Sequence, residues 1–156
     1  MRGKKAKPRV ARPDSRYNSV VVTKFINYIM QDGRKKIATK IVYDAIEEAG
    51  KQLKMKPLEA METAFNNIKP KIEVKSRRVG GSNYQVPVPV PDERQLTLAL
   101  RWLIAAAKGS RGSNSFSDTI ARELVASTKK EGVAYKKRED VEKMAEANRA
   151  FAHFQW

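Results

Sequence analysis

Few side chains of this 156-residue chain have the types and spacing that catalysis requires. The chain has no cysteine, which removes thiolate nucleophiles, disulfides and cysteine-ligated zinc. One histidine, His153, cannot build a histidine metal site, and we interpret it as a partly exposed residue at a helix end. Glu47–Glu48 and Asp92–Glu93 are sequence neighbours, and such neighbours on a helix do not face each other. Without a glycine-rich phosphate loop of the required spacing, the sequence predicts no enzyme, no metal site and no cofactor.

Basic side chains outnumber acidic side chains in this chain. Lysine and arginine total 32 against 17 acidic residues, which gives a net charge of +15 and a pI near 10.1. An excess of this size attracts polyanions, and nucleic acid is the first partner to consider. No segment approaches the roughly 20 apolar residues of a membrane span, and no apolar signal region follows the basic start. We therefore expect no membrane partner and no secretory signal.

Residues 71–90 predict a β-hairpin arm in a chain that is otherwise helical. Period-two alternation on both sides of a turn at 80–83 indicates two strands. Pro87 and Pro89 cannot donate ladder hydrogen bonds, which argues against a wider sheet. The candidate binding residues of this arm are Lys75, Arg77, Arg78, Gly80, Gly81 and Tyr84. Because a lone hairpin is marginal in water, we expect a polyanion to hold this one in shape.

The first 16 residues form a basic N-terminal extension. It has no hydrophobic period and is interrupted by prolines, so we expect it to be extended unless a partner orders it. Its candidate binding residues are Arg2, Lys4, Lys5, Lys7, Arg9, Arg12 and Arg16. Arg34, Lys35 and Lys36 follow at a predicted helix start, where they oppose the helix dipole. A solvated charge run is the alternative for both segments.

One predicted helix carries a basic stripe formed by Arg94, Arg101 and Lys108. These residues recur every seven positions and so share a face, roughly opposite the leucines. The Gly/Ser loop 108–115 adds Arg111, with a plain interhelical linker as the equal alternative. A further run at 136–138 precedes the last predicted helix. Dispersed cations of this kind suit a folded RNA, whereas helix-turn-helix proteins concentrate their DNA contacts on one recognition helix.

Hydrophobic periodicity predicts the helices that must position these cations. The predicted helices lie near 19–31, between 34 and Gly50, and at 57–69, 91–107, 116–129 and 139–152. The fold class we expect is all-α in the main: a bundle of about six helices with one protruding two-stranded β-hairpin, in a single domain over 1–156. The aromatic C-terminus is predicted to dock onto the body or a partner. We expect Tyr84 to contact the ligand by stacking or through its backbone, and Trp102 to pack.

Five strings together resemble the small-subunit ribosomal protein seven family in its bacterial and organellar form. They are residues 24–27 (KFIN), 76–81 (SRRVGG), 84–87 (YQVP), 101–103 (RWL) and 144–154 (MAEANRAFAHF). The resemblance runs in order over nearly the whole chain. The hairpin string and the C-terminal string are the specific ones, and a chance match to both is very improbable.

The resemblance implies a structural constituent of the ribosome that binds rRNA early and organises the 3′ major domain, the head, of small-subunit 16S-type rRNA. It places the hairpin beside exit-site tRNA and mRNA, with small-subunit proteins nine and eleven among the neighbours in the head and platform. The expected location is the ribosome in the cytoplasm, or in an organellar matrix or stroma. In the family, RNA-facing regions correspond here to 2–16, 34–36, 75–84 and the stripe from Arg94 to Lys108.

One departure and one alternative qualify this hypothesis. The family usually has a more basic segment ahead of the fifth helix, where this chain has the loop 108–115. The resemblance therefore supports an RNA contact by Arg111 less than it supports the other contacts. The alternative from another class is a nucleoid-type DNA-binding protein whose arm enters a groove. Such arms often carry an apolar wedge at the tip, whereas this tip is Gly80-Gly81-Ser82-Asn83. An enzyme is the third and most distant hypothesis.

Overall fold

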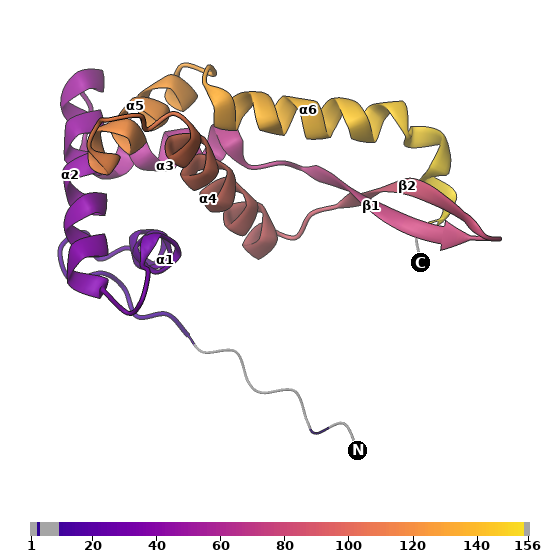
Figure 1. Ribbon diagram of the computed structural model, residues 1–156, viewed down its shortest axis with the longest axis horizontal. Coiled ribbons are helices and arrows are strands. Elements are labelled where there is room, and N and C mark those ends of the chain that lie inside the picture. The colour runs from indigo at the N-terminus through magenta and orange to yellow at the C-terminus, as the bar shows by residue number, and fades with distance from the viewer. Residues whose placement is uncertain (1–2, 4–9, 155–156) are drawn as a thin grey trace.

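Helices dominate the computed structural model, which describes residue 3 and residues 10–154. The α-helices are α1 (Val20–Ile29), α2 (Lys35–Leu53), α3 (Pro57–Ile68), α4 (Asp92–Gly109), α5 (Phe116–Thr128) and α6 (Val133–Ala147), and a 3₁₀ helix, η1 (Arg149–Phe154), follows them. Strands β1 (Ile72–Val79) and β2 (Ser82–Pro89) form one antiparallel pair. Helices α1 to α5 gather at one end, and the hairpin extends away from them with α6 beside it (Figure 1). The predicted fold, mainly helical with a protruding hairpin, is confirmed.

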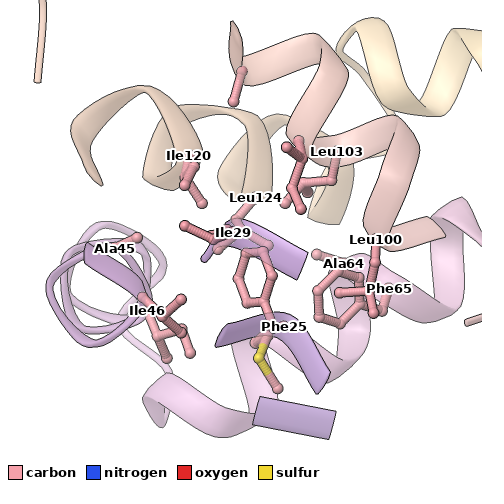
Figure 2. Packing of buried hydrophobic residues seen from close by; sticks show 14 of the residues in the cluster. Phe25, Ile29, Ala45, Ile46, Ala64, Phe65, Leu100, Leu103, Ile120 and Leu124 are labelled. Atoms are coloured by element: carbon pink, nitrogen blue, oxygen red, sulfur yellow. The ribbon is translucent and has the colours of Figure 1, made fainter. Parts of the chain in front are cut away.

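The hydrophobic core lies among α1 to α5. Figure 2 shows its side chains converging from these helices, including Leu100, Leu103 and Leu124, which are fully buried. The rings of Phe25 and Phe65 meet edge to face, with centroids 5.4 Å apart. Each large apolar side chain buried in this way stabilises the fold by roughly 1.5–3 kcal/mol. The leucines of α4 therefore face the core, as their spacing predicts.

The hairpin turn is tighter than the predicted four residues. Val79 pairs with Ser82, which leaves a loop of two residues, Gly80 and Gly81. Their φ angles are +57° and +91°. A type I′ turn joins two strands through a two-residue loop that matches their twist. It requires a positive φ at both loop positions. Glycine adopts such angles without steric cost, whereas a side chain at either position would be strained.

Helix α2 does not end near Gly50, and the prediction was wrong there. The helix continues to Leu53 and ends at Lys54, whose φ is +55°. A Cβ atom on Gly50 would lie 3.0 Å from the Cα atom of Pro57. The glycine therefore permits the close approach of α2 to the start of α3, and it does not terminate the helix.

Helix α6 begins earlier than predicted, at Val133, so the basic run 136–138 lies inside the helix. The buried carboxylate of Glu123, on α5, accepts a 2.7 Å hydrogen bond from the backbone N–H of Ala134. A carboxylate at a helix N-terminus satisfies a free amide and complements the helix dipole. The predicted end of this helix at residue 152 was also wrong, because α6 ends at Ala147.

Candidate nucleic-acid interface

The basic N-terminal extension is described only from residue 10, apart from Gly3. The predicted binding residues Arg2, Lys4, Lys5, Lys7 and Arg9 therefore lie outside the described residues. Arg12 is exposed, and its backbone carbonyl accepts a 2.8 Å hydrogen bond from the Thr23 hydroxyl of α1. This hydrogen bond holds Arg12 beside α1.

Asp14 fastens the next part of the extension to α2. Its carboxylate accepts hydrogen bonds from the Tyr43 hydroxyl at 2.8 and 2.9 Å and from the backbone N–H groups of Arg16 and Tyr17 at 3.0 and 3.1 Å. Partial burial alone would raise the pKa of Asp14, but these hydrogen bonds outweigh it and the pKa is lowered. Burial, together with the bond to Asp14, raises the pKa of Tyr43. Arg16, predicted to bind RNA, forms an ion pair with Glu47 at 2.5 Å.

Basic residues from four separate segments come together on one side of the body. Arg34, Lys108 and Arg111 line one hollow. Lys35, next to Arg34 in the chain, lines a second hollow together with Arg12. The guanidinium of Arg101 lies 5.9 Å from the centre of the Tyr28 ring on α1. We call this set the body patch: Arg12, Arg34, Lys35, Arg101, Lys108 and Arg111, all exposed at the surface.

Arg94 stands apart from the body patch, at the root of the hairpin. Its Nε donates to both carboxylate oxygens of Glu73, at 2.9 and 3.0 Å. Lys75 contacts the same carboxylate at 3.2 Å, and Glu73 is only 8% exposed. Of the predicted RNA-binding cations, Arg94 therefore helps to attach the hairpin to α4, whereas Lys75 pairs with Glu73 within β1. Toward the tip, Arg78 is exposed and Arg77 is half-buried, and with Lys75 they form what we call the hairpin patch.

Tyr84 packs against the chain's own C-terminal segment. Its ring centre lies 5.2 Å from the ring centres of both Phe151 and Phe154. For Phe151 and Phe154, the predicted docking of the terminal aromatics is thus onto the protein itself, through the hairpin, whereas Trp156 lies outside the described residues. The arm also gains support from α6, which runs beside it (Figure 1). The expectation that a polyanion holds the arm in shape is therefore incomplete, because α6 and η1 also pack against the arm within the chain.

Two further residues take structural positions. Trp102 is half-buried and packs against the core, as predicted. Arg138 donates a 2.9 Å hydrogen bond to the carbonyl oxygen of Asn67 and lies 4.5 Å from the centre of the Tyr135 ring. Of the run 136–138, only Lys136 and Lys137 are left exposed to a ligand. Charge patterns cannot reveal such a difference, since it depends on what lies across from each side chain.

The described residues offer contacts for binding an anionic partner. Among residue 3 and residues 10–154, no three His, Cys, Asp or Glu side chains are grouped so that they could hold a metal ion. Within the same residues, no helix is long and apolar enough to cross a membrane. What the surface does present is two groups of cations, the body patch and the hairpin patch, which suit the spaced phosphates of a nucleic acid.

Known proteins resemble this chain over its full length. The family described as "Ribosomal protein S7p/S5e" matches residues 1–149. A protein named "Small ribosomal subunit protein uS7" from Kosmotoga olearia is 51% identical over 156 residues, which is all of both chains. The protein of the same name from Lactococcus lactis subsp. cremoris is also 51% identical over 156 residues and all of both chains. That of Treponema denticola is 48% identical over 155 residues, 99% of each chain.

Proposed function

The chain belongs to the ribosomal protein S7p/S5e family, the uS7 proteins of the small ribosomal subunit, and on this premise we propose that it organises the head of that subunit by binding the 3′ major domain of 16S-type rRNA. In this role it is a structural component of a ribonucleoprotein in translation, located in the cytoplasm on the ribosome. Its activity is binding, through charge and shape.

The observation that carries the proposal is the distribution of cations over two distant patches. Arg94 and Lys108 mark the two ends of the basic stripe on α4, and 14 residues of helix separate them by about 21 Å. Beyond Arg94 the hairpin patch extends the basic surface further, and at the other end of the stripe Lys108 belongs to the body patch. A straight duplex cannot follow cations arranged along an arm and around a helical body. A folded RNA, whose phosphates approach from several directions, can do so.

The hairpin is suited to reach a second ligand on the ribosome. It is backed by α6 and fastened at its root through Glu73 and Arg94, so its tip is presented at a defined distance from the body. We therefore assign the tip to the neighbourhood of exit-site tRNA and mRNA, in line with the family. Small-subunit proteins nine and eleven are the proposed protein neighbours.

An architectural DNA-binding protein is the second candidate, and the shape of the tip weighs against it. Proteins that kink DNA commonly insert an apolar side chain between base steps. The tip of this arm is Gly80 and Gly81, which have no side chain to insert. The family membership weighs against DNA binding as well.

The proposed function is tested by measuring binding of the full chain to a transcript of the 3′ major domain of 16S-type rRNA. A duplex DNA of equal total charge is the control. We expect tight binding to the transcript, and weaker binding to the duplex at the same salt concentration. Equal affinity for both would contradict the proposal, as would recovery of the chain free of small subunits when a cell extract is sedimented at low salt.

A further inference from the structure

One hollow of the body patch combines an apolar floor with a cationic rim. It lies between the α1–α2 loop, the first turns of α2, the end of α4 and the start of α5. Ile37, Ile41 and Phe116 contribute apolar surface, while Arg34, Lys108 and Arg111 contribute positive charge. The sequence distributes these residues over four segments, so the hollow exists only in the folded protein.

Ile37 is the unusual member of the floor. The residue is 57% exposed, is the third residue of α2 and directly follows Lys35 and Lys36. A large apolar side chain exposed among basic residues adds little to folding, because it is not taken out of water. Neighbouring Ile41 and Phe116 are partly buried and continue the apolar surface into the hollow. A ligand that covers Ile37 would remove this surface from water.

The rim favours an anion. Arg34, Lys108 and Arg111 are exposed, and the guanidinium of Arg111 lies 5.8 Å from the centre of the Phe116 ring. One acid, Asp32, also lines the hollow, 4.0 Å from Arg34, so the cations exceed the acids by two. The N-terminus of α2, at Arg34 and Lys35, has no acidic residue in its first turn and no side-chain cap. The positive end of the helix dipole therefore adds to the positive rim.

A nucleotide combines the two chemistries that the hollow presents. A phosphate backbone alone would leave the apolar floor unused, and an apolar peptide would leave the cations unpaired. An unstacked base has an apolar face for the floor and carries its phosphates on either side for the rim. Gln31 and Asp32, at the edge of the hollow, add an amide and a carboxylate that can hydrogen-bond to the edge of a base.

We infer that this hollow binds one unstacked nucleotide from a single-stranded or bulged segment of the rRNA. The base packs on Ile37, Ile41 and Phe116, and the flanking phosphates contact Arg34, Lys108 and Arg111. This inference rests on the proposed function, since the nucleotide belongs to the same rRNA. It adds a base contact to a surface that otherwise binds through phosphates.

The test compares Ile37→Ser with Val133→Ser in the full chain, with the transcript of the 3′ major domain as the probe. Val133 is a matched control because it is also β-branched, lies in the first turn of α6 and is 58% exposed. Ile37 supplies apolar contact area to the base that a serine cannot, so Ile37→Ser should weaken binding by roughly 5- to 30-fold. Val133→Ser should change the affinity less than twofold. Thermal unfolding of both variants checks that each is folded.

The salt dependence separates the base contact from the phosphate contacts. Ile37→Ser should leave the slope of log affinity against log salt unchanged, whereas Lys108→Ala should reduce it by about one. Equal affinities of Ile37→Ser and Val133→Ser would overturn the inference. So would a loss that appears only when other small-subunit proteins are present, since the hollow would then bind protein. Failure of the unmodified chain to bind the transcript would instead contradict the proposed function.

Discussion

Glu73 is the residue that joins the hairpin to the helical body. It lies on β1, is nearly buried, and accepts hydrogen bonds from Arg94 at the start of α4. Lys75 contacts it from the same strand. A buried carboxylate of this kind is tolerated because two cations compensate it. The arrangement sets the hairpin against α4 at one defined point.

Replacing Glu73 by glutamine should therefore destabilise the protein. The amide keeps the shape but removes the charge that Arg94 and Lys75 contact. Because Arg94 is half exposed and can be hydrated, we expect a loss of only about 1 kcal/mol in the free energy of unfolding. Urea unfolding measures it, with Glu62→Gln on the exposed face of α3 as the control. Equal losses in the two variants would show that the Glu73 contact is not stabilising.

Asp14 makes a prediction about pH. Because its pKa is lowered in the folded protein, its contribution to stability is fully present above the unfolded-state pKa, near 4. The contribution is lost as the pH falls through the lower, folded-state pKa. Asp14→Asn should thus reduce stability at pH 7, and its difference from the unmodified chain should shrink by pH 3. Urea unfolding at both pH values gives the comparison, and a difference that grows toward low pH would contradict the assignment.

Among the elements, the hairpin, α6 and η1 act as one unit. The hairpin has two strands, and an isolated pair of strands is marginal in water. Here Val86 of β2 is fully buried, Tyr84 packs on Phe151 and Phe154, and α6 lies beside β1. Through Phe151 and Phe154, the C-terminal segment thus packs against an arm that lies far from it in the sequence.

Truncation of that support should loosen the arm and leave the body intact. In Phe151→Ala the ring contact with Tyr84 is lost, which costs about 1 kcal/mol or more. Hydrogen exchange of the backbone amides at 76–85 should therefore become faster, while amides of α2 and α5 should keep their protection. Met144→Ala, at a half-exposed position of α6, is the control. Unchanged exchange in the hairpin of Phe151→Ala would refute the support by η1.

The whole molecule places its two basic patches at opposite ends of α4. The body patch surrounds the α1–α2 loop and the end of α4, and the hairpin patch lies beyond Arg94. We propose that one RNA contacts both patches at once. Because the two patches share no contacting residues, their contributions to the free energy of binding should add.

This additivity can be measured with three variants. Arg77→Ala with Arg78→Ala, and Arg101→Ala with Lys108→Ala, should each weaken binding to the transcript by on the order of tenfold. Each pair should lower the salt slope by about two. The fourfold variant should lose affinity by the product of the two factors. A pair of substitutions that leaves the affinity and the salt slope unchanged would show that its patch does not contact the transcript.

Much of the fold was predictable because its signals are local. Helical periodicity indicated α1, α3, α4 and α5 to within a few residues, and alternation around Gly80 and Gly81 indicated the hairpin. The start of α6 was missed because the carboxylate that caps it, Glu123, belongs to α5. The role of Gly50 was missed for the same reason, since its close neighbour Pro57 lies beyond the helix end.

The sequence by itself determined the helical pattern, the two-stranded arm and the strong positive charge, because each of these depends on residues a few positions apart or on simple counts. It also indicated that the charged side chains are not spaced as a catalytic site requires. Only the tertiary structure decided which cations are free for a ligand. Arg94 donates a hydrogen bond to Glu73, and Arg138 donates one to the carbonyl oxygen of Asn67. Arg34 and Lys108 lie together at the rim of a hollow with an apolar floor. These outcomes depend on contacts between residues 20 to 75 positions apart, and packing, which no local pattern encodes, selects them.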